Sequence, residues 1–168
     1  MFLLGEYQNR IDPRGRVFIP VKFRDQIGSP VHMVIDGRSC IECYNEDGIK
    51  SKFENAVSKE DNLLKKETII EGLRLNGDTQ PIDNQGRIIL KPAFISKIKA
   101  DKDVVFIGAC DHFEIWAKDE FEKMRDKINE RKNAASDIED LEEEIRLIEK
   151  RKELLQRKKA LMAELEEI

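Results

Sequence analysis

Short apolar runs separated by glycine, proline and polar turn residues fill the first two thirds of the chain, whereas the last third has a helical pattern without glycine or proline. Short runs rich in β-branched and aromatic side chains are typical of strands, and apolar positions three or four apart are typical of helices. Strands are expected at 5–11, 16–19, 31–35, 39–44, 104–107 and 112–116, and helices at 21–27, 46–57, 93–98 and from 118 onward. The pattern predicts a mostly β fold with helices, followed by a long C-terminal α-helix.

Residues 11–20 have the composition of a tight hairpin turn that presents positive charge. Asp12 at the first turn position can accept hydrogen bonds from backbone N–H groups, the following proline presets φ, and Gly15 tolerates a positive φ. Arg14 and Arg16 lie on or beside this turn. The stretch contains no residue that is suited to act as a catalytic acid, base or nucleophile.

The same turn occurs again 71 residues later, as Asp83-Asn84-Gln85-Gly86-Arg87. With one residue inserted, 41–44 also matches 113–116. A repeat of this length indicates two related small units in one chain. The predicted organisation is a first repeat at 1–57, a linker at 58–68, a second repeat at 69–125, and a C-terminal amphipathic helix at 126–168.

Both copies of this Asp-x-x-Gly-Arg motif, with the segments 2–7, 19–24, 104–108 and 112–116, resemble the MraZ family of bacterial transcriptional regulators. Two matching copies at the right spacing make the resemblance specific, and it covers roughly residues 1–125. It implies a double-split β-barrel built from two tandem AbrB-like swapped-hairpin repeats. It also implies a ring-like homo-oligomer that binds short tandem repeats in double-stranded promoter DNA, upstream of the division and cell-wall gene cluster.

The resemblance implicates the motif arginine in DNA contact, which is Arg16 and, by the repeat, Arg87. Arg14 takes the family's basic turn position, and Gln85 replaces it in the second copy, so the second hairpin is expected to bind more weakly or to serve the structure. The remaining candidate DNA-binding residues are Arg10, Lys22 and Arg24. The residues expected to shape the two turns are Asp12, Gly15, Asp83 and Gly86. The alternative is that the arginines only brace the turns through ion pairs.

The distribution of charge favours DNA binding more than the net charge of −4 does. Residues 8–24 hold five basic residues and one acidic residue, a local charge of +4, whereas 118–168 holds 13 basic and 16 acidic residues. The first hairpin therefore has a positive field, and affinity for DNA should fall as salt rises. One such patch is small, so several copies side by side are expected to provide the affinity.

Composition predicts a soluble protein, since 38% of residues are charged and no apolar run is long enough to span a membrane. Three cysteines without a secretory signal suggest a reducing cytoplasm. The family resemblance implies association with the nucleoid. The Cys40-x-x-Cys43 pair suggests a zinc or redox site, and Cys110 and His112 fall near the corresponding place in the second copy of the repeat. Strand alternation would place the first two cysteines on opposite faces, so buried apolar roles are favoured and no metal or cofactor is expected. No small-molecule substrate and no enzymatic activity are expected, because no nucleophile–base pair or phosphate-binding loop is visible.

The last fifty residues predict a long amphipathic helix. Ile138, Leu141, Ile145 and Ile148 follow heptad spacing, and Lys152 and Lys159 interrupt the apolar stripe. A coiled coil with a partner subunit and a solvated helix packed on its own domain both fit this pattern. Two other functions also remain open. One is a structural ring or scaffold assembled through this helix, and the other is an antitoxin-like DNA-binding partner, although a helical tail differs from the disordered tail such proteins use.

Overall fold

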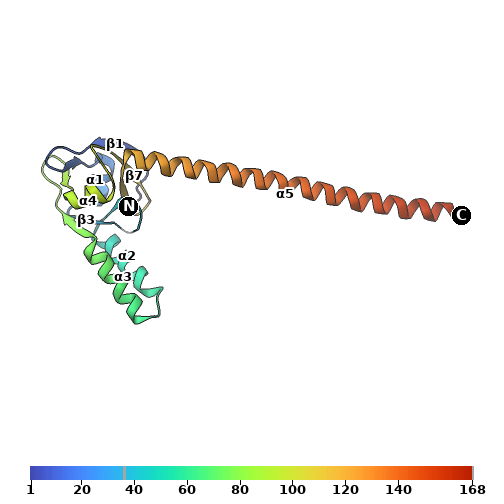
Figure 1. The fold of residues 1–168 in the computed structure, drawn as a ribbon, viewed down its shortest axis with the longest axis horizontal. Coiled ribbons are helices and arrows are strands. Elements are labelled where there is room, and N and C mark those ends of the chain that lie inside the picture. Colours follow the sequence, from blue (N-terminus) through green and yellow to red (C-terminus); the bar gives the residue numbers. More distant parts are fainter. Residues whose placement is uncertain (36, 168) are drawn as a thin grey trace. The chain divides into compact units, whose positions relative to one another are not determined.

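The computed structural model describes residues 1–35 and 37–167 (Figure 1). The first half of the chain forms β1 (Glu6–Arg10), β2 (Arg16–Phe18), α1 (Val21–Ile27), β3 (Val31–Val34), β4 (Cys40–Tyr44) and α2 (Glu46–Ser58). The second half forms α3 (Leu63–Leu75), β5 (Gly77–Gln80), β6 (Arg87–Ile89), α4 (Pro92–Lys97), β7 (Asp103–Gly108), β8 (Phe113–Ala117) and α5 (Lys118–Glu166). The expected strands and helices are confirmed, with shifts of one or two residues at their ends. Asp36 of an expected Asp36-Gly37 hairpin turn and the final residue, Ile168, lie outside the described residues.

Helix α3 occupies most of the segment expected as a linker and extends to residue 75. Its N-cap is Asn62, whose side chain accepts a hydrogen bond from the backbone N–H of Lys65 at 3.1 Å. Ile69 and Leu73 of this helix pack with α2 and β3 in a small second apolar cluster. Because this cluster stabilises the helix, the next strand, β5, begins only at Gly77.

The strands of the two halves exchange partners. The large sheet has the antiparallel order β1-β7-β8-β4-β3-β5, and β2 pairs with β6 in a separate ribbon. Strand β1 pairs with β7, with Tyr7 opposite Phe106, whereas β5 pairs with β3, with Asp78 opposite Met33. The strands of each repeat's first hairpin, β1-β2 and β5-β6, therefore pair with strands of the other half, so the hairpins interleave as the swapped-hairpin resemblance implied.

Two residue pairs mark a local two-fold relation between the halves. In the ribbon, Val17 pairs with Ile88, which is 71 residues further on. In the sheet, Glu42 pairs with Glu114, which is 72 residues further on. Because each residue faces its own equivalent, both pairs lie on the approximate two-fold axis.

One apolar core joins the sheet to the ribbon. Val17 and Ile88 of the ribbon are at most 1% exposed and belong to the same cluster as Phe106 and Phe113 of the sheet. The large sheet is nevertheless open, with β1 and β5 as its edges among the described strands, so its pairing does not close it into a barrel. Among the described strands, the short β2 and β6 pair only with each other, which keeps the ribbon separate from those edges. A mostly β fold with helices and a long C-terminal helix is what the structure establishes.

By its internal contacts the chain divides into two compact units, Met1–Lys123 and Met124–Ile168. The second unit is helical as far as Glu166, and its heptad side chains are exposed, for example Ile138 at 56% and Ile145 at 55%. Over residues 1–35 and 37–167, no helix combines the length and the apolar character needed to cross a bilayer.

Candidate nucleic-acid interface

The carboxylate of Asp12 holds the first turn (residues 12–16). Its Oδ1 accepts hydrogen bonds from the backbone N–H groups of Arg14 at 2.9 Å and Arg16 at 2.8 Å, and its Oδ2 accepts from Nε of Arg16 at 2.6 Å. Gly15 has a φ of 79°, a conformation that residues with a Cβ rarely adopt. The motif therefore fixes the backbone of the turn and orients its second arginine.

The second turn (residues 83–87) repeats this geometry. Oδ1 of Asp83 accepts from the backbone N–H groups of Gln85 and Arg87, each at 2.9 Å, and Oδ2 accepts from Nε of Arg87 at 2.7 Å. Gly86 has a φ of 86°. The two copies of the sequence motif thus form the same hydrogen-bonded turn.

Hydrogen bonds favour the ionised form of both turn carboxylates. Burial acts to raise the pKa of Asp12, but hydrogen bonds from Arg16 and Arg14 outweigh it, and the pKa is lowered. The pKa of Asp83 is lowered mainly by the backbone hydrogen bond from Arg87, against an opposing effect of burial. At neutral pH each turn therefore contains a carboxylate–guanidinium pair.

The ribbon couples the two turns. The N–H of Leu90 donates to the carbonyl of Gly15 at 2.7 Å, and the N–H of Ile19 donates to the carbonyl of Gly86 at 3.0 Å. A Cβ at Gly15 would lie only 2.7 Å from the carbonyl oxygen of Leu90, so this close approach requires glycine. Each turn is therefore held partly by the other half of the chain.

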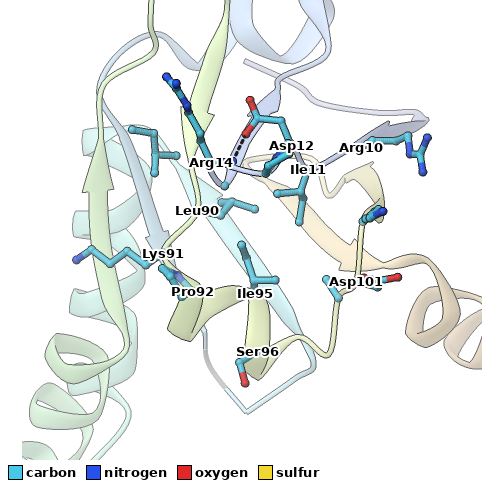
Figure 2. Close-up of a pocket in the computed structure, with 15 residues that line it drawn as sticks. Arg10, Ile11, Asp12, Arg14, Leu90, Lys91, Pro92, Ile95, Ser96 and Asp101 are labelled. Carbon is cyan, nitrogen blue, oxygen red and sulfur yellow. Dashed lines mark hydrogen bonds between the residues drawn. The ribbon is translucent and has the colours of Figure 1, made fainter.

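A groove of about 970 Å³ opens beside the first turn. Its floor is apolar and includes Ile11, Leu90 and Ile95. Exposed basic side chains line its rim, namely Arg10, Arg14, Lys91 and Lys102. Figure 2 shows Arg10, Arg14 and Lys91 extending away from the floor on different sides. We call this feature the basic groove, and its positive, open rim suits contact with the phosphates of a nucleic-acid backbone.

The structure separates the predicted DNA-binding residues into three groups. Arg10 and Arg14 share the basic groove, and Arg10 is also paired with Asp103 at 3.2 Å. Arg16 and Arg87 are 29% and 18% exposed and are held by their motif carboxylates. Among the described residues, no hydrogen bond involves their terminal Nη atoms, which leaves these donors for a further acceptor.

Helix α1 carries the remaining two predicted residues. Lys22 is exposed and does not line the basic groove. Arg24 lies against the second turn, where a Cβ placed on Gly86 would collide with its Nη1. The structure therefore brings Arg24 to the second turn, and Arg10 and Arg14 to the first.

Lys91 and Lys102 are candidate contacts that the sequence analysis missed. Lys91 follows β6 and is paired with Asp78 at 2.8 Å, whereas Lys102 precedes β7. Both come from the second half of the chain but line a groove beside the turn of the first half. The expected interleaving of the hairpins was the available signal, because it predicts that the second half supplies neighbours to the first turn.

A buried ionic cluster surrounds the Glu42–Glu114 pair. Nη2 of Arg38 bridges the two carboxylates, at 2.7 Å from Glu42 and 2.5 Å from Glu114. Lys52 pairs with Glu42 at 2.8 Å. Burial acts to raise the pKa of Glu114, but contacts with His112 and other neighbours, including Arg38, lower it to about 2. The cluster therefore joins β4 and β8 through charged groups at the centre of the sheet.

The two cysteines of the Cys-x-x-Cys pair lie in different surroundings. Cys43 belongs to the main apolar core, whereas Cys40 lies beside the ionic cluster. The ligand atoms of Cys40, Glu42 and Glu114 lie within 4.8 Å of one another, but the guanidinium of Arg38 already bridges the two carboxylates. Burial and the neighbouring Glu114 raise the pKa of the Cys40 thiol to about 12. A thiol with this pKa is a weak nucleophile and a poor metal ligand at neutral pH.

Comparison with known proteins identifies the family of this chain. A family model described as "MraZ protein, putative antitoxin-like" matches residues 2–69 and 75–144. The chain belongs to the MraZ family. The two matched segments correspond to the two copies of the turn motif, so the tandem MraZ repeats are established.

Several relatives in the MraZ family bear the name "Transcriptional regulator MraZ". The protein from Lactobacillus delbrueckii subsp. bulgaricus is 31% identical over 143 residues, which cover 83% of this chain and 98% of the relative. The protein from Caldanaerobacter subterraneus subsp. tengcongensis is 34% identical over 123 residues, covering 72% of this chain and 85% of the relative. The protein from Mycoplasma mobile is 27% identical over 133 residues, covering 78% and 90%.

Proposed function

We propose that this protein is a sequence-specific DNA-binding transcriptional regulator that contacts DNA through its arginine-bearing turns. The observation that carries the proposal is the basic groove, where Asp12 fixes the first turn while Arg14 and Arg10 remain exposed at the rim. The name that the relatives from Lactobacillus and Caldanaerobacter bear, transcriptional regulator, supports the same class of function. Nothing in this role requires a cofactor, a metal or a catalytic residue.

The basic residues have two different roles in DNA recognition. Arg14, Arg10, Lys22 and Arg24 contact phosphates and position the protein, since exposed flexible cations contribute affinity without reading sequence. Arg16 is oriented by Asp12 and offers its Nη atoms to a base edge, where a bidentate contact with guanine contributes about 1–3 kcal/mol of discrimination. Arg87 has the same orientation in the second turn but less exposure, so its contribution is smaller.

Assembly provides the remaining affinity. A chain with a net charge of −4 and one basic groove binds DNA weakly by itself. A ring-like homo-oligomer places several such turns against short tandem repeats in a promoter, and the effective concentration of each turn then raises the overall affinity. The target we propose is the promoter of the division and cell-wall gene cluster, in a cytoplasmic, nucleoid-associated protein. A double-split β-barrel, in which the ribbon and sheet enclose their shared core, is the fold we propose for each subunit.

The decisive experiment measures binding of the full chain to DNA from upstream of its own gene and to shuffled DNA of equal length, at two salt concentrations. We expect preference for the upstream DNA and a steep loss of affinity at the higher salt. Arg16→Ala should lower the preference, and Arg14→Ala should lower affinity for both DNAs. Arg74→Ala, which removes one exposed charge paired with Glu71 on α3, is the matched control and should bind as the unmodified protein does.

A structural ring or scaffold is the second candidate function, favoured by the exposed apolar positions of α5. In that case the arginines only brace their turns. Equal binding to upstream and shuffled DNA, with Arg14→Ala and Arg16→Ala both unchanged and assembly intact, would establish the scaffold and reject the regulator.

A further inference from the structure

The stretch of α5 from Ile138 to Met162, the heptad segment, has an exposed face with a seven-residue repeat. Its a and d positions alternate along the helix and are Ile138, Leu141, Ile145, Ile148, Lys152, Leu155, Lys159 and Met162. The six apolar side chains of this set are each at least 50% exposed. A helix with such a stripe is stabilised when a second helix covers it. The match to the family model ends at residue 144, so most of the heptad segment lies beyond it.

Charge along this part of the helix is divided into two blocks. Residues 137–149 hold seven acidic residues and one basic residue, a net charge of −6. Residues 150–159 hold six basic residues and one acidic residue, a net charge of +5. The blocks meet near the middle of the heptad segment, so the two ends of the segment are complementary to each other.

A parallel, in-register pair of these helices would place like charges together. At the a positions, Lys152 of one copy would face Lys152 of the other, and Lys159 would face Lys159. At the flanking g and e positions, Glu144 of one copy would face Glu149 of the other. No g–e pair of this arrangement in the segment joins opposite charges, so parallel pairing is disfavoured.

An antiparallel pair places each a position opposite a d position. With Ile138 of one copy opposite Met162 of the other, Ile145 lies opposite Leu155. Lys152 then lies opposite Ile148 rather than opposite another lysine. The two lysines that interrupt the stripe therefore fall beside the acidic block of the other copy, and their aliphatic stems can cover the apolar seam.

Two of the g-position contacts in the antiparallel pair are complementary. Asp137 and Glu144 occupy g positions in the acidic block, and Arg151 and Lys158 occupy them in the basic block. In antiparallel coiled coils the g positions of one helix face those of the other. Glu144 of one copy therefore lies beside Lys158 of the other, twice in each pair, whereas Arg151 meets its own copy once, at the centre.

We propose that the heptad segment is a self-association surface, in which two copies of this chain pair antiparallel with Ile138 opposite Met162. The occupant is a second copy because the acidic and basic blocks have similar lengths and nearly balancing charges, so the segment is complementary to itself when reversed. The surface is separate from the arginine-bearing turns, and self-association here holds whether or not the protein binds DNA.

Disulfide trapping in the full chain tests the orientation. Ile138→Cys and Met162→Cys are made separately in a Cys110→Ser background, because Cys110 is exposed whereas Cys40 and Cys43 are buried. After the two proteins are unfolded, mixed, refolded and oxidised, we expect a mixed disulfide between residues 138 and 162, identified by mass spectrometry. Ile138→Cys alone should give none, since its two copies would lie about 36 Å apart along an antiparallel pair.

Matched controls are Glu143→Cys and Arg157→Cys, which lie at the same level of the antiparallel pair as each other but occupy outward f positions. These two variants should not form a mixed disulfide. A 138–138 disulfide in the single variant would establish parallel pairing and overturn the proposal. Absence of every disulfide among the a and d variants would overturn it as well, by showing that a different partner or none covers the stripe.

Exchanging charges provides a second test, because the same substitution should weaken association in the antiparallel pair and strengthen it in a parallel pair. In the 138/162 mixture, Glu144→Lys in both proteins should lower the disulfide yield several-fold, because it faces Lys158 in the antiparallel pair. Adding Lys158→Glu should restore the yield. In a parallel pair Glu144→Lys would instead relieve repulsion from Glu149 and increase association, which contradicts the proposal.

Discussion

The two turns of this protein share a sequence motif and a hydrogen-bond pattern but face different neighbours. In the first turn, Gly15 lies near Ile95 of α4, beside the open basic groove. In the second turn, Gly86 is buried beneath Arg24 of α1. Ile95 and Arg24 are equivalent positions of the repeat, 71 residues apart. The motif thus encodes the turn, whereas the helix from the other half decides what lies beside it.

Side chains on the turns extend this difference. The middle of the first turn carries the exposed Arg14, and the same position of the second carries Gln85. The guanidinium of Arg87 lies 5.7 Å from the ring of Phe18, which covers one of its faces. The first turn is therefore open and cationic, and the second is more covered. This difference suits a main DNA contact at the first turn and a supporting contact at the second.

The largest expected effect concerns the two motif glycines. Gly15→Ala should lower the free energy of unfolding by about 3 kcal/mol, because the new Cβ combines an unfavourable positive φ with a collision against the Leu90 carbonyl. Gly86→Ala should cost only about 1 kcal/mol, since it meets the flexible end of Arg24, which can move. Chemical denaturation of both variants measures the difference, and equal losses would show that the two turns are equally constrained.

Acid should separate the two equivalent glutamates at the sheet centre. The pKa of Glu114 is lowered to about 2, so its stabilising contribution is present above the ordinary carboxyl pKa and is lost as pH falls towards 2. We expect a loss on the order of 2 kcal/mol between pH 4.5 and pH 2, after allowing for solvent screening. Unfolding measured across this range should show a flatter acid limb for Glu114→Gln than for Glu42→Gln. The same slope in both variants would contradict the assignment.

Removing the cation from the first turn should weaken DNA binding more than any change at the second turn. Arg14→Ala should lower affinity for DNA about tenfold. The slope of log affinity against log salt concentration should become shallower by about one for each phosphate contact that the variant loses. Titration of fluorescent DNA at several salt concentrations measures both quantities. Gln85→Ala is the matched control at the equivalent position and should bind within error of the unmodified protein. A larger loss of DNA affinity in Gln85→Ala than in Arg14→Ala would make the second turn the main DNA contact.

The smallest expected effect comes from making the second turn resemble the first. Gln85→Arg adds a cation at an exposed position of an already formed turn, so affinity should rise about threefold with unchanged stability. The same DNA titration, together with thermal unfolding, checks this. Unchanged affinity would indicate that the second turn does not approach DNA.

Local sequence signals alone predict the structure of both turns and most of the helices and strands. The Asp12 carboxylate accepts hydrogen bonds from the turn backbone and Gly15 adopts its positive φ at low cost, and the repetition of both residues at Asp83 and Gly86 predicted the second turn. The short helices at 21–27 and 46–57 were also predictable, because their signals lie within a few neighbouring residues. The resemblance to the MraZ family was recognised from the two copies of the same motif.

Which residues share a surface follows from the packing of the whole fold. Lys91 and Lys102 line the basic groove because strands exchange between the two halves, and no local pattern states which strand end lies beside which turn. The facing of Glu42 and Glu114 depends on the register of β4 with β8. The reason is physical: turn formation depends on contacts a few residues apart, whereas the groove and the ionic cluster depend on packing between segments that are far apart in the sequence.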